Sequence, residues 1–473
     1  MMKVRNPRTG ALDYEIDPLD AGRLAALASD LRDRQRHWAN RSAAERAEML
    51  RSLGAAIARH ADAIGAALTI DTGRRAISAI EVDGTARAFD RWASIAPDLI
   101  ARATGGARAS ATPGIVVTTR LVPYPLVGVI SPWNFPLTLA LIDAIPALAA
   151  GCAVIVKPSE VTPRFIRPLM AAIAEVPDVP LAVIEGDGAT GAALVDAVDY
   201  IAFTGSVATG RKVAAAAAAA FIPASLELGG KDPMIVLASA DPVWAARVAL
   251  RASIVNSGQA CQSIERVYVA QQIAEPFLAA LVAEAKAVRL NADDIGAGEI
   301  GPFIFARQAE IVQAQIEDAV AKGATVLAGG TVESIGGGQY LRPTVLTGVT
   351  PDMAIMAEET FGPVIPVTVF DHVDDAVALA NGGVFGLSAA VLAGSAEEAE
   401  AVGERLNAGA VSINDGSLTA MVWDAEKSSF GASGLGPSRM GESGLLRFFR
   451  KQALLRQTGT ALPIQAYAED ARR

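Results

Sequence analysis

The stretch Tyr200-Ile201-Ala202-Phe203-Thr204-Gly205-Ser206-Val207-Ala208-Thr209-Gly210 leads a short apolar strand into a glycine turn and then into a helix. An apolar run that ends at glycine is typical of a buried strand, and the alanine-rich segment that follows is typical of a helix. This strand–turn–helix unit is the last of four successive units, and their repetition decides the fold class.

Three similar units lie upstream. Apolar runs that each lead into a helical segment occur at residues 126–130, 153–156 and 181–185. Strands that alternate with helices in this way predict a parallel sheet covered by helices. The alternation resumes after Glu227, with strands and helices at 234–237, 242–257, 266–270 and 274–287, and more up to about residue 411. We therefore predict a second α/β domain.

Two further segments have patterns of their own. Residues 20–101 carry apolar side chains at a spacing of three to four, which predicts an all-helical start. Residues 115–122 are rich in β-branched side chains and follow glycines and a proline, which predicts a strand pair or an extended arm. Arms of this kind often pack on another subunit, so we expect an oligomer.

The composition narrows the class of protein. A chain of 473 residues with 51% hydrophobic and 19% charged residues is long enough for two or three domains. Because 51 acidic residues outnumber 41 basic ones, we expect no nucleic acid partner. The longest apolar stretch, residues 137–156, is broken by Asp143, Pro146 and Gly151, so we expect no membrane span. Two unlike cysteines and no apolar signal segment favour the cytoplasm.

The two cysteines have different surroundings. Cys152 begins a β-branched run that predicts a buried strand, where a thiol is an inert part of the core. Cys261, in Gly258-Gln259-Ala260-Cys261-Gln262, follows a polar stretch that can present its side chain to a cleft. A thiolate is a strong nucleophile, and a carboxylate such as Glu227 can activate a water that hydrolyses its adduct. This pairing indicates chemistry on a carbonyl group.

The glycine turn after residue 204 has features of an anion site. Gly205 lets the turn approach a ligand, and the free N–H groups at the helix start near Ser206 suit a pyrophosphate. The spacing differs from the three-glycine dinucleotide fingerprint, and a two-glycine turn also arises for structural reasons alone. The turn by itself does not identify a cofactor.

Six motifs together resemble the aldehyde dehydrogenase superfamily, in order and in spacing. They are Ser131-Pro132-Trp133-Asn134-Phe135-Pro136, Lys157-Pro158-Ser159-Glu160, Phe203-Thr204-Gly205-Ser206, Glu227-Leu228-Gly229-Gly230-Lys231, Gly258-Gln259-Ala260-Cys261 and Glu358-Glu359-Thr360-Phe361-Gly362-Pro363-Val364. The resemblance implies an α/β fold that is aldehyde dehydrogenase-like, with a Rossmann-type cofactor domain, an α/β catalytic domain and a small β oligomerisation arm. The implied boundaries are 1–104 and 124–228 for the NAD-binding domain, 229–447 for the catalytic domain, and 105–123 and 448–473 for the arm.

The resemblance also implies an NAD-dependent aldehyde dehydrogenase that uses no metal. Cys261 would attack the aldehyde, and Asn134 with the backbone N–H of Cys261 would bind the thiohemiacetal oxyanion. Loss of hydride to a nicotinamide leaves a thioester, which Glu227 would hydrolyse through an activated water to give the carboxylic acid. Alternatively, Asn134 caps the helix that begins near Pro136, or does both. Glu227 could likewise be a surface residue at a strand end.

For the cofactor, the resemblance implies contacts from several of these motifs. Lys157 and Glu160 would bind the adenosine ribose, Ser206 the pyrophosphate and Glu359 the nicotinamide ribose. The full implied set is Trp133, Lys157, Ser159, Glu160, Gly205, Ser206, Leu228, Gly229, Glu359 and Phe361. Glu160 accepts hydrogen bonds from ribose hydroxyls and repels a 2′-phosphate, which favours NAD over NADP. Because the Lys157 ammonium partly offsets this repulsion, NADP is the weaker alternative.

The same motifs place a set of side chains in the substrate tunnel: Phe135, Thr138, Ile142, Gln262 and Trp423. This mixed aromatic and aliphatic set contains no arginine, which favours a medium-sized aromatic or aliphatic aldehyde. If Arg439 reaches the pocket, a semialdehyde dehydrogenase is the alternative.

The chain departs from the family pattern at two places. Residues 433–441 contain Arg439 but lack the acidic residue of the common block, and Asp143 stands where many relatives have lysine. We predict that Asp143 and Arg439 form a charge-swapped version of the family's buried lysine–glutamate pair, which lies along the route by which protons leave the base. Two unrelated substitutions are the alternative.

Three functions compete at this stage. A hydrolytic aldehyde dehydrogenase needs Cys261, Glu227 and Asn134 together, whereas an acyl-CoA-forming or acid-reducing relative does not need Glu227. A binding protein on this fold would lose the catalytic set, and all three residues are present. Residues 451–457 resemble the family's C-terminal strand that joins a neighbour's sheet, which implies a homodimer or homotetramer.

Overall fold

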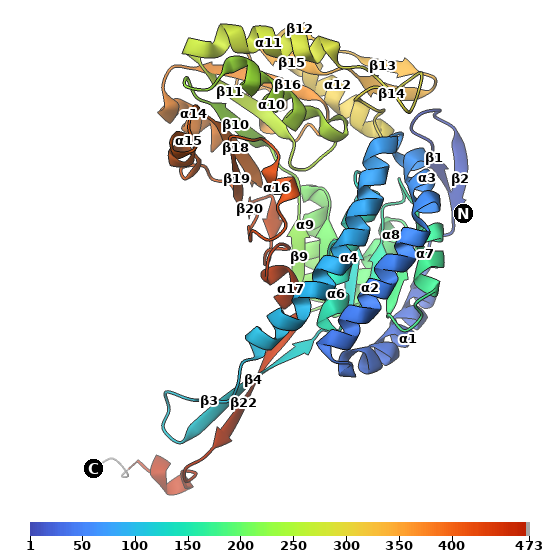
Figure 1. The fold of residues 1–473 in the computed structure, drawn as a ribbon, viewed down its shortest axis with the longest axis vertical. Coiled ribbons are helices and arrows are strands. Elements are labelled where there is room, and N and C mark those ends of the chain that lie inside the picture. The colour runs from blue at the N-terminus through green and yellow to red at the C-terminus, as the bar shows by residue number, and fades with distance from the viewer. Residues whose placement is uncertain (470–473) are drawn as a thin grey trace.

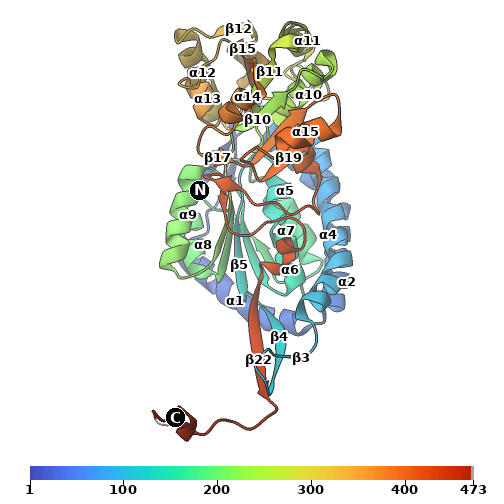
Figure 2. The same cartoon turned by 90° about the vertical axis from the view of Figure 1, so that its left-hand side faces the viewer.

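The computed structural model describes residues 1–469 and contains two α/β bodies and a projecting arm (Figure 1). Each body is built on a mainly parallel sheet of its own. Figures 1 and 2 show the two bodies stacked along the long axis, with the arm leaving the lower body on the side away from the upper one. The mixed α/β fold with parallel sheets that the sequence predicts is confirmed.

The first hundred residues form a helical layer on the lower body. As predicted, this region is helical, with α1 (Ala21–Asn40), α2 (Ala43–Arg59), α3 (Ala61–Thr72) and α4 (Arg75–Thr104). The start of α2 is fixed by a capping box, because the Ser42 hydroxyl accepts from Glu45 N and the Glu45 carboxylate accepts from Ser42 N. An N-terminal hairpin, β1 (Met2–Arg5) and β2 (Leu12–Ile16), was not predicted.

The lower body contains a six-stranded sheet in the order β21-β9-β8-β5-β6-β7, in which only β21 is antiparallel to its neighbour. Its strands are β5 (Leu126–Ile130), β6 (Ala153–Lys157), β7 (Leu181–Val183), β8 (Tyr200–Thr204), β9 (Ala224–Glu227) and β21 (Gly434–Leu435). Its helices are α5 (Pro136–Leu141), α6 (Ala144–Ala150), α7 (Ile166–Ala174), α8 (Gly188–Ala197) and α9 (Val207–Ala219). Ligands of open α/β sheets bind beyond the carboxyl ends of the strands, which is where Glu227 ends β9.

The upper body contains a seven-stranded sheet in the order β12-β15-β16-β11-β10-β18-β19, in which only β12 is antiparallel to its neighbour. Its strands are β10 (Asp232–Val236), β11 (Ile264–Ala270), β12 (Thr325–Ala328), β15 (Thr344–Thr347), β16 (Val364–Phe370), β18 (Ser388–Leu392) and β19 (Ala410–Ile413). Its helices are α10 (Pro242–Ile254), α11 (Ala274–Ala287), α12 (Ala306–Ala321), α13 (Ala354–Ala357), α14 (Val373–Ala380), α15 (Ala396–Gly403) and α16 (Leu418–Met421). β13 (Val332–Ile335) and β14 (Gly338–Leu341) form a hairpin, and β17 (Phe385–Gly386) pairs with β20 (Phe430–Gly431) in a separate two-stranded antiparallel sheet.

The helix predicted at 242–257 is shorter than expected. It ends at Ile254, and a tight turn follows in which Asn256 and Ser257 have φ angles of 61° and 57°. Left-handed backbone is costly for residues other than glycine and persists only where surrounding contacts impose it. This part of the prediction was therefore wrong at the segment that leads to Cys261.

The arm is a three-stranded antiparallel sheet in the order β22-β4-β3. Its strands are β3 (Arg108–Ala109), β4 (Ile115–Pro123) and β22 (Phe449–Gln457), and the short helix α17 (Ser443–Leu446) leads into β22. β22 pairs with β4 along its whole length and forms one edge of the sheet. The extended segment expected at 115–122 is therefore present. Among residues 1–469, no helix is long and apolar enough to cross a membrane.

Candidate active site

The loop that carries Cys261 lies between α10 and β11 and is held by buried hydrogen bonds. The Gln259 amide donates to the carbonyls of Asn256 and Pro302, at 3.3 Å each, and its oxygen accepts from Ile304 N at 2.9 Å. Gly258 has a φ of 69°, and a Cβ at this position would collide with the Gly362 backbone. These contacts impose the left-handed turn and fix where Cys261 emerges.

Asn134 lies in the turn between β5 and α5, directly beside this loop. Its Nδ2 donates to the Gln259 carbonyl at 3.0 Å, and Asn256 Nδ2 donates to the Asn134 carbonyl at 3.1 Å. An amide nitrogen carries two hydrogens, so one remains available after the bond to Gln259. The side chain makes no capping bond to α5, whose N-cap residue is Phe135. The capping alternative for Asn134 was therefore wrong.

The start of α5 is held by a buried carboxylate instead. Glu81, on α4, accepts from the N–H groups of Leu137 and Thr138 at 3.1 and 3.0 Å. Burial raises the pKa of Glu81 to about 7, although these hydrogen bonds act in the opposite direction. The residues that follow Asn134 are thus fixed by a buried contact of their own.

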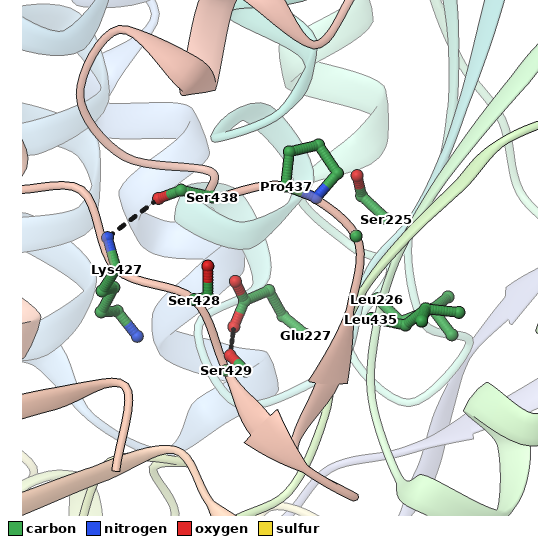
Figure 3. Close-up of a pocket in the computed structure, with 10 residues that line it drawn as sticks. Ser225, Leu226, Glu227, Lys427, Ser428, Ser429, Leu435, Pro437 and Ser438 are labelled. Atoms are coloured by element: carbon green, nitrogen blue, oxygen red, sulfur yellow. Dashed lines mark hydrogen bonds between the residues drawn. The ribbon is translucent and has the colours of Figure 1, made fainter.

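Glu227 is half-buried at the end of β9 and points into a small pocket (Figure 3). The Ser429 hydroxyl donates to its Oε2 at 3.0 Å. The pocket is lined by Ser225, Leu226, Glu227, Lys427, Ser428, Ser429, Leu435, Gly436, Pro437 and Ser438. Most of these residues come from the C-terminal segment, which β21 brings against β9. Glu227 is therefore part of a pocket wall and not a freely solvated surface residue.

Charged groups surround Cys261. Burial raises the pKa of its thiol to about 12, and the Lys427 ammonium acts against this rise. The negative charges of three carboxylates raise its pKa further: Glu227, Asp232 and Glu359. Cys152, in contrast, has no exposed surface, and burial raises the pKa of its thiol even more. Its place in the lower core fits the inert role expected from the sequence.

Several of the residues implied for a dinucleotide stand in positions that fit one. Ser206 caps α9, where its hydroxyl accepts from Thr209 N at 3.3 Å, and Ser206 and Ala208 at this helix start are exposed, as a bound pyrophosphate requires. Gly229 leaves room for the Glu359 carboxylate, which a Cβ there would meet at 2.5 Å. Lys157 Nζ donates to Glu160 Oε2 at 3.0 Å, which leaves the other Glu160 oxygen for a hydroxyl.

Phe361 is held close to Trp133, with ring centroids 5.4 Å apart and an edge-to-face angle of 79°. Its backbone is left-handed, with a φ of 54°, and its N–H donates to Glu265 Oε1 at 2.8 Å. Glu265 is buried and pairs with the Lys231 ammonium at 2.8 Å. The ion pair beneath the loop therefore sets the position of the aromatic side chain.

Asp143 and Arg439 form the predicted pair. Arg439 Nη2 donates to Asp143 Oδ2 at 2.7 Å and to Thr204 Oγ1 at 2.6 Å. Arg447 donates to the other Asp143 oxygen, a contact that was not predicted. Burial alone would raise the pKa of Asp143, but the two guanidinium groups hold it below its usual range. Arg439 Nη2 thus binds two partners, while Arg439 Nε is buried without a hydrogen-bond partner among residues 1–469.

The five side chains expected in the substrate tunnel are all half-buried. Phe135, Thr138 and Ile142 follow one another at helical spacing from the turn after β5. Gln262 directly follows the nucleophile, and Trp423 lies beneath the Arg91 guanidinium at 4.6 Å. The structure thus provides apolar surface on the α5 side.

Several residues of the site were missed from the sequence: Glu81, Gln259, Lys427, Ser429 and Arg447. Gln259 lies in the motif Gly258-Gln259-Ala260-Cys261, and a polar side chain this close to the nucleophile could have indicated a structural role. A lysine followed by two serines ahead of Phe430-Gly431 was a weaker one. Glu81 lies within α4, and Arg447 lies between α17 and β22. Neither belongs to a sequence motif that would indicate a role at the site.

Comparison with known proteins places the chain in a family. The model of the aldehyde dehydrogenase family matches residues 1–454. The chain belongs to that family. This aldehyde dehydrogenase is therefore an oxidoreductase that oxidises an aldehyde to a carboxylic acid with NAD(P).

Individual relatives cover nearly the whole chain. A putative aldehyde dehydrogenase, PutA, from Anabaena variabilis is 50% identical, with a TM-score of 0.95 over 98% of each chain. Betaine aldehyde dehydrogenase from Staphylococcus aureus, solved in complex with NAD+, is 29% identical, with a TM-score of 0.90 over 98% of this chain and 92% of that one. A putative succinate-semialdehyde dehydrogenase [NADP(+)] from Mycolicibacterium smegmatis is 37% identical over 91% of this chain and 84% of its own length.

Proposed function

We propose that this enzyme is a hydrolytic, NAD-dependent aldehyde dehydrogenase in which Cys261 is the nucleophile, Glu227 the base and Asn134 the oxyanion donor. The observation that carries the proposal is the bond from Asn134 Nδ2 to the Gln259 carbonyl, two residues before Cys261. It joins the amide donor to the loop of the nucleophile across 125 residues of sequence. A pair fixed before substrate arrives stabilises the developing charge without reorganisation.

In the first step, the Cys261 thiolate attacks the aldehyde carbon. The carbonyl oxygen becomes an oxyanion, which the second hydrogen of Asn134 Nδ2 and the backbone N–H of Cys261 would bind. The carbon then carries the Cys261 sulfur, the oxyanion, one hydrogen and the side chain of the aldehyde. Asn134 and Cys261 hold this adduct in a single orientation.

The residues implied for the cofactor fit NAD. Ser206 at the start of α9 would bind the pyrophosphate, Glu160 and Lys157 the adenosine ribose, and Glu359 and Phe361 the nicotinamide end. The remaining members of the set, Trp133, Ser159, Gly205, Leu228 and Gly229, would line the same path. Bound nicotinamide supplies the acceptor for the hydride of the adduct. The free oxygen of Glu160 supports NAD over NADP, because a 2′-phosphate would meet a carboxylate.

In the last step, Glu227 removes a proton from water, which attacks the thioester and releases the acid and the Cys261 thiolate. The Ser429 hydroxyl holds one carboxylate oxygen, so the other is free to accept the proton. This hydrogen bond restricts the rotation of the Glu227 side chain and keeps the carboxylate in position. Glu227 is not needed if coenzyme A takes the acyl group, so this step separates hydrolysis from that alternative.

For the substrate, we favour a medium-sized aromatic or aliphatic aldehyde. The α5 side of the expected tunnel offers Phe135 and Ile142, and Arg439 is paired with Asp143. The relative from Mycolicibacterium smegmatis favours a second candidate, a semialdehyde with a carboxylate at its far end. Such a substrate needs a cation in the pocket. Arg439 Nη2 already binds Asp143 and Thr204, whereas Lys427 lines the pocket of Glu227 and would be the cation for this second candidate.

The experiment that tests the function follows NADH with Glu227→Gln and Cys261→Ala beside the natural enzyme, on benzaldehyde, hexanal and succinic semialdehyde. We expect Glu227→Gln to form one NADH per active site in a burst and then to slow by about 10²-fold or more, because hydrolysis has lost its base. Cys261→Ala should form none. Natural enzyme that needs coenzyme A for turnover, or Glu227→Gln with unchanged steady-state turnover, would contradict the hydrolytic proposal.

A further inference from the structure

The first turns of α4 bury a stripe of polar side chains. Arg74, which directly precedes the helix, is followed by Ser78, Glu81 and Thr85 at spacings of four, three and four residues, so the four lie on one face. All of them are at most 5% exposed. The buried face of a helix is usually apolar, because a buried polar group is costly unless it forms hydrogen bonds. This stripe therefore needs hydrogen-bond partners.

Most side-chain polar atoms of the stripe have no partner in the protein. The three guanidinium nitrogens of Arg74 are buried and form no hydrogen bond within residues 1–469. The same holds for Oε1 of Glu81 and Oγ1 of Thr85, whereas the Ser78 hydroxyl donates to the Arg74 carbonyl at 2.6 Å. Burial lowers the pKa of Arg74 to about 10, so the guanidinium stays charged at neutral pH and keeps its five N–H donors. These donors require an acceptor that the described residues do not supply.

Arg74 lies against the backbone that supports the Cys261 loop. A Cβ on Gly301 would meet Cγ and Cδ of Arg74 at 2.5 and 2.9 Å, so the stem of the arginine packs on this glycine. Gly301 also exchanges two hydrogen bonds with the Ser257 hydroxyl, at 3.1 and 3.2 Å. Ser257 belongs to the left-handed turn that leads to Cys261. The position of Arg74 is therefore coupled to the loop of the nucleophile through a single glycine.

Glu81, two helical turns further along, lies against the segment that carries Asn134. Its Oε2 accepts from the N–H groups of Leu137 and Thr138, so the carboxylate fixes the start of α5 and only Oε1 lacks a partner. Asn134 itself is tied to the Cys261 loop, because Asn256 Nδ2 donates to its carbonyl at 3.1 Å. The two ends of the stripe thus touch the two segments that meet at the site.

Arg74 and Glu81 carry opposite charges on the same face, yet no hydrogen bond joins them. Burial lowers the pKa of Arg74 and raises that of Glu81, and the charge of each residue opposes the change in the other. A water molecule suits both groups, because its oxygen accepts from the guanidinium while its hydrogens donate to Oε1. A small anion would accept from Arg74, but it has no hydrogen for Glu81 and its charge would be repelled.

We propose that ordered water joins Arg74 to Glu81, and that Arg74 is thereby a positioning residue that holds the Cys261 loop and the Asn134 segment at a fixed distance. This role rests on the proposed function, in which Cys261 attacks the aldehyde and Asn134 binds the oxyanion. Arg74 reaches one segment through Gly301 and the other through water and Glu81. A displacement of about 1 Å between reacting groups can cost about a hundredfold in rate, so such a link supports the attack.

The first test is a crystal structure of the natural enzyme at a resolution that shows ordered water. We expect a water oxygen within hydrogen-bond distance of a guanidinium nitrogen of Arg74 and of Glu81 Oε1. Direct contact between the guanidinium and the carboxylate would overturn the water link, and so would an ion that binds Arg74 alone. This test does not depend on any activity of the enzyme.

The second test measures single-turnover formation of NADH from hexanal by stopped flow, in a Glu227→Gln background where hydrolysis is slow. It compares Arg74→Met and Arg74→Lys with Arg75→Met, a matched control that removes the exposed charge of the next residue. We expect Arg74→Met to slow NADH formation about tenfold or more. Arg74→Lys should restore most of the rate, because an ammonium also donates to water, and Arg75→Met should leave it unchanged.

A double-mutant cycle with Glu81→Gln separates positioning through Glu81 from a general loss of packing. The loss caused by Arg74→Met should be smaller when Glu81→Gln is already present. Equal losses with and without Glu81→Gln, or an unchanged rate in Arg74→Met, would overturn the positioning role. If Arg74→Met does not fold, as judged by circular dichroism, Arg74→Gln replaces it. A Glu227→Gln enzyme that forms no NADH at all would instead contradict the proposed function, so the two failures can be told apart.

Discussion

Glu81 links the stability of the protein to pH through one buried carboxyl. Its pKa is raised from 4.5 to about 7 by burial, so the folded state binds more protons than the unfolded state between these values. Stability is therefore lost as the pH rises from about 4.5 to about 7. We expect Glu81→Gln to remove this loss of stability with rising pH. The amide has no charge, and its oxygen can still accept from the N–H groups of Leu137 and Thr138. Thermal unfolding should favour the variant more at pH 8 than at pH 5, and equal differences at both would contradict this role.

The charge of Glu160 is expected to set the preference for NAD over NADP. Replacing it by glutamine removes the repulsion of a 2′-phosphate and frees the Lys157 ammonium, which is now paired with it. We expect kcat/KM with NADP to rise about tenfold relative to that with NAD, equivalent to roughly 1.4 kcal/mol. The matched control is Glu358→Gln, which removes an exposed carboxylate from the loop after α13. An unchanged cofactor ratio in Glu160→Gln would rule out this basis for selectivity.

Site residues could be predicted where they stand inside a recognisable sequence motif, and not where they join the site through long-range contacts. Cys261, Glu227 and Asn134 stand inside motifs, so the sequence nominated them. Ser429 was missed because its bond to Glu227 spans 202 positions and depends on β21 reaching β9. No local pattern encodes such a contact.

Between elements, the buried contact of Asp143 joins the α5–α6 turn to the C-terminal segment. Asp143 accepts from Arg439 and Arg447, so its removal leaves two buried guanidinium groups without their counter-charge. We expect Asp143→Ala to lower the free energy of unfolding by about 3–5 kcal/mol. A double-mutant cycle of Asp143→Ala and Arg439→Ala should show non-additive effects on the free energy of unfolding, measured with urea, and on turnover. Additive effects would mean that the pair is incidental to stability and to the proton route.

The bounds of elements were predictable where local pattern dominates. The strand at 126–130 and the helix at 274–287 were predicted with the bounds that the structure shows, because each follows its own periodicity. The end of α10 was not, because the left-handed turn at Asn256 and Ser257 is imposed by distant contacts. Ser257, for example, exchanges hydrogen bonds with Gly301, 44 positions away. Tertiary packing overrides helix propensity there.

At the scale of the molecule, the arm offers an edge strand to a second chain. β22 is exposed along most of its length, and Leu454 and Leu455 add apolar side chains that are 46% and 69% exposed. Unpaired edges of this kind are templates for pairing, which supports the dimer or tetramer that the sequence predicted.

We expect Leu455→Arg to weaken this assembly, because a charge on the strand opposes burial in an interface. Light scattering should show the mass falling toward the 48.8 kDa of one chain. Lys451→Arg, on the same strand, keeps its charge and serves as the control. A natural enzyme that already has the mass of one chain at micromolar concentration would contradict the assembly itself.

The pairing of β22 with β4 also sets an order of events during biosynthesis. The two strands are neighbours in space, yet β4 ends at Pro123 and β22 begins at Phe449. At about 5–20 residues per second, roughly tens of seconds of translation separate them. During that time the edge of β4 that later pairs with β22 has no partner, and the sheet of the lower body also lacks β21. The arm is therefore completed only once β22 has been synthesised, and subunits can associate through it only after β22 has left the exit tunnel.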